Sequence, residues 1–339
     1  MRVAVVGASG FSGMELCRLA SEHQDIELVA AITDRWKGER LGDRVEVASV
    51  ARDLVMAPQA SVHEAVRRAT IVALATPAEV SLELAPLLLE AGHRVIDLSG
   101  AFRLEDPAMY PRWYNFTHPR PDLLREARYA LPQILAAAGD APAIAQARLV
   151  ANPGCYATAA ILALAPLLSR GLVDASVFVD GKSGVTGAGR KVAERYLFTE
   201  VSETVAPYRV IDHQHVPEIE QALSRAARRA VQVTFAPHLL PVQRGLIATA
   251  FGRLAVGAEP DAVVTAIRDA YAGSDIVRVK PTEEVTIAAV ARTPRAIVGA
   301  RADAERRSFV SICAIDNLLK GAASQAMENI LAMIGATSP

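Results

Sequence analysis

A glycine-rich turn between a strand and a helix constrains the N-terminal fold more than any other feature of this chain. An apolar run over residues 3–6 is followed by the turn GASGFSG and by a helical stretch over residues 14–23. Glycines let phosphates approach the backbone, and a helix N-terminus offers N–H groups and a positive dipole end. The turn therefore predicts a dinucleotide site, although its G-x-x-G-x-x-G spacing also suits a tight turn without a ligand. The predicted cofactor-binding residues of this turn are Gly7, Ser9, Gly10, Phe11, Ser12 and Gly13.

Buried strands and helices alternate along the first half of the chain. The strand candidates are residues 26–32, 71–75, 95–98 and 149–151, with a helix predicted over residues 80–90. Strands that alternate with helices predict a parallel sheet with crossover connections. Prolines punctuate residues 102–132, where we expect an ordered but irregular excursion.

The second half of the chain has a different pattern of apolar residues. Its strand candidates are residues 177–179, 231–235, 246–254, 276–279 and 285–291, some with period-two alternation. This pattern predicts a mostly antiparallel sheet in an α+β domain. Residues 317–334 have the pattern of a strongly amphipathic helix that packs back on the first domain. We therefore expect an α/β fold with a Rossmann-type dinucleotide-binding domain (1–154 and 313–339) and an α+β catalytic and oligomerisation domain (155–312).

Composition excludes several classes of protein. The 339 residues carry 36 basic and 37 acidic side chains, a formal net charge of −1, and 51% of them are hydrophobic. Such a chain is globular, and without a Lys/Arg-rich block it lacks the charge pattern of a binder of nucleic acid or anionic membranes. No segment approaches the roughly 20 apolar residues of a membrane span, and the N-terminus lacks a signal-peptide pattern. We expect a cytoplasmic protein whose partner is a small molecule.

The residues after the second predicted strand favour two different cofactors. Thr33, Asp34, Arg35 and Lys37 stand where the adenosine ribose lies in a dinucleotide-binding fold. The carboxylate of Asp34 suits the ribose hydroxyls of NAD, whereas Arg35 or Lys37 suits the 2′-phosphate of NADP. Solvated surface charge is the third interpretation.

Cys155 is the candidate nucleophile. It follows the turn Asn152-Pro153-Gly154 and begins an apolar helix predicted over residues 156–168. A helix N-terminus stabilises a thiolate and lowers the cysteine pKa from about 8.5. Cys17 and Cys313 lie in helical and apolar stretches, where a cysteine acts as a small buried hydrophobe. Because the three cysteines suit neither a disulfide framework nor a zinc site, we expect a reducing compartment and no metal.

Two of the seven histidines stand together in a polar cluster. His213 and His215 precede a helix predicted over residues 219–227, and Glu218 falls near its first turn. Such a cluster is typical of a site rather than a core, and it offers Cys155 an acid/base partner. A metal site is the alternative, but no third ligand accompanies the pair. His238 is a further candidate.

A glycine-rich loop and two arginines are candidates for contact with anions. The loop KSGVTGAGR, residues 182–190, suits close approach to a cofactor ring or an anionic substrate and ends in the cation Arg190. Arg103 and Arg244 are further candidates, since a guanidinium binds carboxylate or phosphate through two hydrogen bonds. Taken singly, each arginine also suits a structural role.

Several motifs together resemble those of the N-acetyl-gamma-glutamyl-phosphate reductases, a family in the wider aspartate-semialdehyde dehydrogenase-like group. The resemblance spans almost the whole chain, and motifs in one order are far more specific than any one alone. They are GASGFSG (7–13), DLSGAFRL (97–104), ANPGCYAT (151–158), KSGVTGAGR (182–190), HQHVPEIEQ (213–221), FAPHLLPVQRG (235–245) and DNLLKGAASQA (316–326).

This resemblance implies an enzyme of arginine biosynthesis. The implied reaction is the NADPH-dependent reduction of N-acetyl-L-glutamyl 5-phosphate to the 5-semialdehyde, with Cys155 as the nucleophile that forms a thioester and His215 as the acid/base. It also implies a homodimer or homotetramer. The remaining implied roles are substrate binding or orientation by Arg103, Arg190, His213 and Glu218, and cofactor binding by Arg35, Ser183, Gly184 and Asn317.

Three alternatives remain at this point. The substrate is another acyl phosphate in the first, either aspartyl phosphate or a carrier-protein-linked glutamyl or aminoadipyl phosphate. The HQHVPEI segment argues against the aspartyl substrate. The second alternative is a Cys–His thiol hydrolase, in which the dinucleotide turn has no role. The third is a non-catalytic nucleotide-binding regulatory module, which would keep its function after Cys155→Ser.

Overall fold

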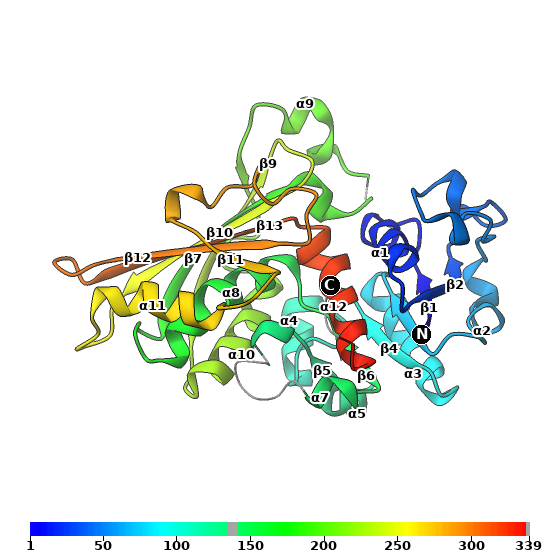
Figure 1. Ribbon diagram of the computed structural model, residues 1–339, viewed down its shortest axis with the longest axis horizontal. Coiled ribbons are helices and arrows are strands. Elements are labelled where there is room, and N and C mark those ends of the chain that lie inside the picture. Colours follow the sequence, from blue (N-terminus) through cyan, green and yellow to red (C-terminus); the bar gives the residue numbers. More distant parts are fainter. Residues whose placement is uncertain (135–141, 191, 337–339) are drawn as a thin grey trace. The chain divides into compact units, whose positions relative to one another are not determined.

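The chain consists of two units in the structure, a computed structural model that describes residues 1–134, 142–190 and 192–336 (Figure 1). Unit 1 is Met1–Gly154 with Ala322–Pro339, and unit 2 is Cys155–Gly321. The sequence-based boundary differs, because it assigned residues 313–321 to the first domain. These residues belong to unit 2, since strand β13 (Ser308–Ile315) continues through Cys313 and pairs within the sheet of that unit.

The described part of unit 1 is built around a six-stranded sheet. Every strand pair in it is parallel, as expected of strands joined by crossovers. The predicted Rossmann-type architecture is therefore confirmed. The strands in spatial order are β2 (Glu27–Ile32), β1 (Arg2–Val6), β3 (Ile71–Leu74), β4 (Arg94–Asp97), β6 (Leu149–Ala151) and β5 (Arg128–Tyr129).

Helices cover both faces of this sheet, because neighbouring residues of a strand point to opposite sides. Val5 of β1 packs in a core with α1 and α12, whereas Val6 packs in a second core with α2 and α3. The α-helices of unit 1 whose bounds fall within the described residues are α1 (Phe11–Glu22), α2 (Val62–Ala65), α3 (Ala78–Glu90), α4 (Tyr110–Tyr114), α5 (Pro121–Glu126), α7 (Pro142–Ala145) and α12 (Ser324–Met333).

The proline-rich segment is irregular, as predicted, with only short helices and strand β5. It contains a buried histidine, His118, among aromatic rings. Its ring centroid lies 4.7 Å from that of Tyr110 and 5.6 Å from that of Phe102. Nδ1 of His118 accepts from the N–H of Arg120, and Nε2 lies 2.9 Å from the carbonyl oxygen of Ala101. The ring is therefore neutral with its proton on Nε2, and burial lowers the pKa of His118.

The C-terminal helix α12 differs from the amphipathic helix that we predicted. Most of its side chains are buried all round, including the polar side chains of Gln325, Glu328 and Asn329. Hydrogen bonds compensate for part of this burial: Gln133 donates to Glu328 Oε2 at 2.6 Å, and Asn329 Nδ2 donates to the carbonyl oxygen of Ala130 at 3.0 Å. The helix follows a π-helical turn, η8 (Leu319–Ala323). The polar positions that suggested a solvent-facing stripe are thus internal hydrogen-bonding positions.

The described part of unit 2 contains a seven-stranded sheet. Two of its strand pairs, β11–β12 and β7–β9, are parallel, and the other four are antiparallel. The predicted mostly antiparallel sheet is confirmed. The strands in spatial order are β11 (Val277–Val279), β12 (Ala296–Asp303), β13 (Ser308–Ile315), β10 (Leu246–Arg253), β7 (Ser176–Gly184), β9 (Gln232–Leu240) and β8 (Ala206–Pro207).

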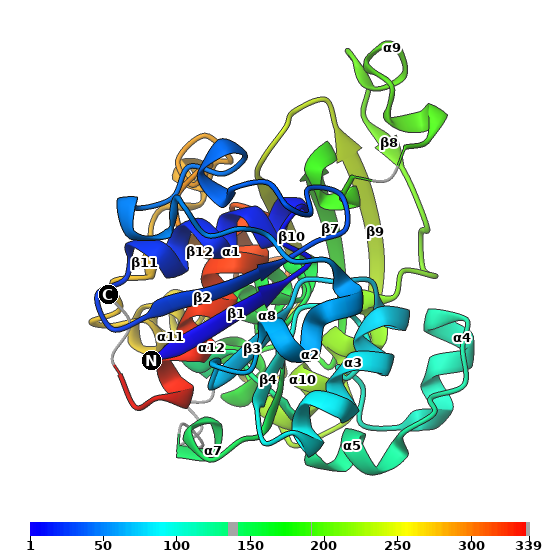
Figure 2. The same ribbon diagram turned by 90° about the vertical axis from the view of Figure 1, so that its right-hand side faces the viewer.

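One face of this sheet is covered by helices. The helices α8 (Cys155–Ser169), α10 (His215–Ala227) and α11 (Pro260–Ala270) lie together there (Figure 1). The segment with α9 (Phe198–Val201) and β8 extends at the β9 edge (Figure 2). Because side chains of a strand alternate, the helix-covered face takes every second residue of β7 and leaves Phe178 on the other face.

The strand predicted over residues 285–291 is wrong. This segment forms turns, and its apolar side chains Val285 and Val290 pack on Ile297 and Ala314. The apolar residues of this segment pack in a local cluster and do not belong to a hydrogen-bonded β-strand. Strands β12 and β13 were not predicted. The first four residues of β12 are all buried, and in β13 the polar Ser311 is buried while the apolar Val310 is exposed, so neither strand shows apolar–polar alternation in its sequence.

Candidate active site

Cys155 is the first residue of α8, a helix of 15 residues. Its thiol is partly exposed, whereas Cys17 and Cys313 are fully buried. Burial raises the pKa of Cys17 to about 12 and that of Cys313 further still, so these two thiols stay protonated. Cys155 instead lies at the positive end of a helix dipole, where a thiolate is stabilised. The position of this cysteine therefore suits a nucleophile.

The residue packed against Cys155 is Gly321, in η8. A Cβ atom at this glycine would lie 2.7 Å from the Cβ of Cys155. The N–H of Gly321 donates to the carbonyl oxygen of Asp316 at 2.9 Å, which fixes the backbone at this approach. Only glycine fits here without moving the cysteine. Gly321 lies within the DNLLKGAASQA motif, but no local pattern in the sequence indicates its contact with Cys155.

The two histidines of the HQH segment lie at the start of α10, and both are buried. Nδ1 of His213 accepts from the backbone N–H of His215 at 3.1 Å, and the ring centroids are 4.7 Å apart. Burial, together with the nearby His215 and Arg209, lowers the pKa of His213 to about 2. His213 is thus a neutral imidazole with its proton on Nε2. Glu218 is fully buried in the first turn of the same helix.

Tyr156 brings the starts of α8 and α10 together. Its ring centroid lies 5.7 Å from that of His213 and 6.1 Å from that of His215. Its hydroxyl donates to the carbonyl oxygen of His238 at 3.1 Å and lies 3.4 Å from the hydroxyl of Tyr208. Cys155 acts electrostatically on both Tyr156 and Tyr208, and the ring centroid of Tyr208 lies 5.7 Å from that of His213. The candidate nucleophile and the histidine pair therefore belong to one cluster in unit 2. Sequence reasoning missed both tyrosines.

His238 enters this cluster through its main chain. Its ring is directed to Asp180, with 3.2 Å between Nδ1 and Oδ1, and Asp180 also pairs with Lys182. These three side chains lie on the face of the sheet that carries Phe178. The structure thus does not bring the imidazole of His238 to the histidine pair.

The arginine proposed as an anion binder, Arg244, is paired with Asp316. Its Nε and Nη2 atoms lie 2.9 and 3.1 Å from the two carboxylate oxygens. The fully buried carboxylate of Asp316 also accepts from the backbone N–H groups of Leu318 and Leu319. This pair fixes the start of the DNLLKGAASQA segment, an anchoring role that spacing alone does not reveal.

The neighbouring Asn317 anchors the glycine-rich loop. Its Oδ1 accepts from the N–H of Gly245 at 2.7 Å, and its Nδ2 donates to Thr186 Oγ1 at 3.0 Å. In the same loop Ser183 is buried, and a Cβ at Gly184 would lie 2.8 Å from the carbonyl oxygen of Val242. The loop backbone is therefore held closely.

Arg190, at the end of this loop, is exposed.

The glycines of the first turn in unit 1 permit close backbone packing. Gly7 has φ = +89°, and its N–H donates to the carbonyl oxygen of Ile32 at 2.9 Å. A Cβ at Gly7 would lie 2.3 Å from the oxygen of Ala75, and one at Gly13 would lie 2.1 Å from the oxygen of Gly7. Gly10 precedes α1 as its N-cap, so no side chain covers the helix N-terminus from that position. The turn fits a pyrophosphate group bound by backbone N–H groups.

The residues after β2 are held in a defined arrangement. Thr33 donates from Oγ1 to Ser9 Oγ at 2.7 Å and accepts from the N–H of Arg35 at 3.2 Å. The carboxylate of Asp34 accepts from the N–H of Gln59 at 2.9 Å. Arg35 itself is exposed. One carboxylate oxygen of Asp34 is thus used by the protein backbone, while the guanidinium of Arg35 extends into solvent.

Arg103 is buried beside the turn that precedes Cys155. Its Nε donates to the carbonyl oxygen of Asn152 at 2.9 Å, and its Nη2 donates to that of Leu98 at 2.7 Å. Burial raises the pKa of the nearby carboxyl of Asp97, whose oxygens accept from Ser99. Arg103 thus holds the end of β6 in addition to any contact with an anion.

Among residues 1–134, 142–190 and 192–336, no three His, Cys, Asp or Glu side chains gather as the ligands of a metal ion would. In the same described ranges, every helix is too short or too polar to cross a bilayer.

Comparison with known proteins gives a consistent set of similarities. The family model "Semialdehyde dehydrogenase, NAD binding domain" matches residues 2–141, and "Semialdehyde dehydrogenase, dimerisation domain" matches residues 155–317. A protein named N-acetyl-gamma-glutamyl-phosphate reductase from Symbiobacterium thermophilum is 41% identical over 338 residues, covering 99% of this chain and 95% of that protein. The protein of the same name from Halorhodospira halophila is 42% identical over 340 residues, with coverage of 99% and 96%.

Solved structures share the fold at lower sequence identity. Aspartate semialdehyde dehydrogenase II from Vibrio cholerae superposes with a TM-score of 0.77 at 15% identity and covers 98% of both chains. Aspartate semialdehyde dehydrogenase with NADP from Candida albicans gives a TM-score of 0.70 at 15% identity, over 99% of this chain and 98% of that one. At such identity these structures support the fold alone.

Proposed function

Because the chain belongs to the N-acetyl-gamma-glutamyl-phosphate reductase family of semialdehyde dehydrogenases, we propose that it reduces N-acetyl-L-glutamyl 5-phosphate to N-acetyl-L-glutamate 5-semialdehyde in arginine biosynthesis. The family resemblance stated from the motifs is confirmed. The observation that carries the proposal is the partly exposed Cys155 at the N-terminus of α8, in the same cluster as the paired histidines of α10.

The proposed chemistry begins at Cys155. Its thiolate attacks the acyl carbon, the bond from that carbon to the phosphate oxygen breaks, and a thioester and inorganic phosphate form. NADPH, when bound, supplies the hydride that reduces this thioester. His215 gives a proton to the former carbonyl oxygen and takes it back when the carbon–sulfur bond breaks, which releases the aldehyde and the thiolate.

We assign the proton transfer to His215 because of the protonation state of its neighbour, His213. His213 has a pKa near 2 and uses Nδ1 as an acceptor, so it is a poor proton donor at neutral pH. We assign to His213 the orientation of His215 at the start of α10. Glu218, Arg103 and Arg190 remain our proposed contacts for the substrate or for His215.

We propose NADP rather than NAD as the cofactor. The backbone N–H groups of the turn at residues 7–13 would hold the pyrophosphate, and the loop with Ser183 and Gly184 would lie near the nicotinamide. The hydrogen bond from Gln59 uses one carboxylate oxygen of Asp34, the group that would favour NAD, whereas Arg35 is exposed and available for a 2′-phosphate. We propose that Asn317 contributes to cofactor binding by holding the loop that contains Ser183 and Gly184.

The variants Arg35→Ala and Lys37→Ala test the choice of cofactor. Loss of a charge-assisted hydrogen bond of about 1.5–3 kcal/mol raises KM for NADP about tenfold or more. We expect this increase for Arg35→Ala, with KM for NAD unchanged. An increase confined to Lys37→Ala would move the role to that lysine, and a wild-type preference for NAD would refute the proposal.

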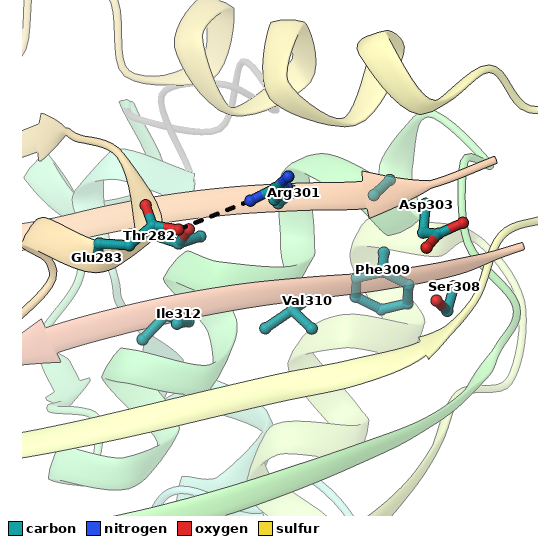
Figure 3. A pocket seen from close by; sticks show the side chains of 9 residues that line it. Thr282, Glu283, Arg301, Asp303, Ser308, Phe309, Val310 and Ile312 are labelled. Atoms are coloured by element: carbon teal, nitrogen blue, oxygen red, sulfur yellow. Dashed lines mark ion pairs between the residues drawn. The ribbon is translucent and has the colours of Figure 1, made fainter. Parts of the chain in front are cut away.

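We further propose a homodimer, in the cytoplasm, that forms through the helix-free face of the unit 2 sheet. Phe178, Phe251 and Val310 are neighbours across β7, β10 and β13, and they are 45%, 41% and 37% exposed. The two phenylalanine rings stack with 5.8 Å between centroids. Beside them lies a groove lined by Phe309, Val310 and Ile312 and bordered by the ion pair between Arg301 and Glu283 (Figure 3). Such an exposed aromatic face suits association with a second copy.

The reaction itself is tested in the reverse direction. Purified protein is given NADP and phosphate with N-acetylglutamate semialdehyde or aspartate semialdehyde, and NADPH formation is followed by absorbance. We expect turnover with the acetylated substrate and none with Cys155→Ser. Turnover with aspartate semialdehyde alone would assign a different substrate. Inactivity with both, in folded protein that binds NADP, would refute the proposed reaction.

A further inference from the structure

The turn that leads to Cys155 is anchored by one buried asparagine. Asn152 is fully buried, three residues before the cysteine. Its backbone N–H donates to the backbone carbonyl oxygen of Asp97 at 2.8 Å, and its own carbonyl oxygen accepts from Arg103. Its side-chain Nδ2 donates to the oxygen of Ala322 at 3.3 Å. The main chain and the carboxamide nitrogen of this residue are thus both held.

The remaining polar atom of Asn152 is held by a residue of the last helix. Oδ1 of Asn152 accepts from Nδ2 of Asn329 in α12 at 3.0 Å. The same Nδ2 atom donates to the carbonyl oxygen of Ala130, also at 3.0 Å. Because a backbone carbonyl only accepts, this second bond fixes which end of the Asn329 amide faces Asn152. Asn329 is fully buried, and the proposed reaction does not use it directly.

The two residues between Asn152 and Cys155 limit how the backbone of this turn can rotate. Pro153 fixes its own φ and restricts Asn152 to extended conformations. Gly154, which has no side chain, has the least restricted backbone dihedrals of the turn. Release of the Asn152 side chain would therefore be transmitted to the cysteine through few rotatable bonds.

The segment before α12 reaches the same turn. The carbonyl oxygen of Ala322 accepts from Asn152, and the adjacent Gly321 packs against Cys155. Both residues belong to the π-helical turn η8, a rare geometry that is frequent at functional sites. The C-terminal segment thus contacts both the anchor and the nucleophile.

We propose that Asn329 is a positioning residue for Cys155. It acts through Asn152, and its amide fixes the orientation of the turn and so the direction of the thiol. The proposal rests on the proposed function, in which Cys155 is the nucleophile. When the amide is removed, Oδ1 of Asn152 loses its buried donor, and the turn takes up further conformations in which the thiol is misaligned.

The test compares Asn329→Ala with Glu328→Gln. Glu328 is the adjacent residue of α12 and accepts a partly buried hydrogen bond from Gln133, whereas the side-chain amide of Asn152 bonds to Ala322 and Asn329. Glu328→Gln therefore controls for a general weakening of the helix. Asn329→Ala is expected to lower kcat about tenfold or more, with KM for NADP within twofold of wild type. Glu328→Gln is expected to keep the wild-type kcat.

Alkylation of Cys155 by iodoacetamide provides a readout that needs neither substrate nor cofactor. The rate is followed from pH 6 to pH 9 by mass spectrometry of the Cys155 peptide, with Cys17 and Cys313 as unreactive internal references. In Asn329→Ala the reaction at neutral pH is expected to be slower and its pH midpoint higher, because the thiolate leaves the helix N-terminus. A lowered melting temperature with an unchanged alkylation profile and kcat would show a merely structural role and overturn the proposal.

A double-mutant cycle with Asn152→Ala tests whether the two asparagines act through one bond. The double variant is expected to lose no more activity than the more damaging single variant, whereas losses that multiply would contradict the proposed route. Asn329→Ser replaces Asn329→Ala if the latter does not fold. If no acyl phosphate reductase activity exists at all, the alkylation profile still decides the positioning role, so the two proposals fail separately.

Discussion

The two histidines at the start of α10 have different chemical capacities. His213 is neutral and uses Nδ1 as an acceptor, which leaves His215 as the group that exchanges a proton. General acid/base catalysis contributes about 10²- to 10⁴-fold. We predict a loss of kcat in this range for His215→Asn and a smaller loss for His213→Asn. Steady-state rates over pH 6 to 9 check this, and an equal or reversed order of the two losses would contradict the assignment.

The glycine against the nucleophile gives a second prediction. In Gly321→Ala the new methyl group would lie 2.7 Å from Cys155 Cβ, so the cysteine or the turn η8 must shift. A displacement of about 1 Å costs about 10²-fold in rate. We expect kcat to fall by this amount while NADP binding, measured by fluorescence titration, is retained. Gly257→Ala controls for strain, because that glycine has positive φ and nothing within 4 Å of the added atom; wild-type rates in both variants would contradict the assigned contact.

Chemistry-bearing residues were predictable from sequence where they lie in a local pattern. Cys155 follows a Pro-Gly turn and precedes an apolar helix, and these neighbours define a helix N-terminus. Asn152 and Asn329 are 177 positions apart, and no local pattern connects them. Their hydrogen bond depends on the packing of β6 and α12. The role of such anchoring residues follows only from tertiary structure.

Secondary structure followed the sequence pattern when a strand or helix had two distinct faces. The alternation in β7 and β10 reflects one helix-covered face and one exposed face. The helix α12 has no exposed stripe, so its polar residues misled the prediction of an amphipathic helix. In β12 burial on both sides of the sheet removed the alternation on which the prediction depends, and in β13 a buried serine and an exposed valine concealed it. Burial in the tertiary structure, rather than the intrinsic propensity of the residues, determined the pattern of apolar and polar residues in these elements.

The buried histidines of the HQH segment and of the proline-rich excursion make stability depend on pH. Burial lowers the pKa of His118 from its usual 6.5, and it lowers that of His213 to about 2. Below pH 6.5 the unfolded chain binds protons that the folded chain does not. The free energy of unfolding therefore falls as pH drops, and His213 continues to contribute until pH approaches 2.

Urea unfolding at pH 7.5, 6.5 and 5.5 measures this dependence. His213 contributes a slope approaching about 1.4 kcal/mol per pH unit well below pH 6.5, and His118 adds a contribution of the same sign. We predict that His213→Asn and His118→Gln each flatten the slope relative to wild type, whereas exposed His63→Asn does not. A slope unchanged in both variants would show that these rings are protonated in the folded protein.

The residues proposed to bind the cofactor pyrophosphate and those proposed to react with the substrate belong to different units of the chain. The turn at residues 7–13 belongs to unit 1, and the nucleophile with the histidine pair belongs to unit 2. The proposed reaction needs both units, and the chain passes between them at Gly154–Cys155 and Gly321–Ala322. The boundary expected from the sequence also falls after Gly154, within the ANPGCYAT motif. The second crossing lies inside a helical segment without a turn signal, so its position required the structure.

The exposed face of the unit 2 sheet gives a prediction for the assembly. Phe178 and Phe251 are directly opposite each other on β7 and β10, so a pair of opposite charges there suits the isolated sheet but not an apolar interface. We expect the double variant Phe178→Glu/Phe251→Lys to sediment as a monomer while its circular dichroism matches that of wild type. Val256→Glu is the control, because Val256 is 99% exposed in the turn after β10. Sedimentation velocity should give twice the mass of one chain for wild type and the control. A double variant that keeps the wild-type mass would place the interface elsewhere, since two buried charges at the centre of an apolar contact leave it unable to form.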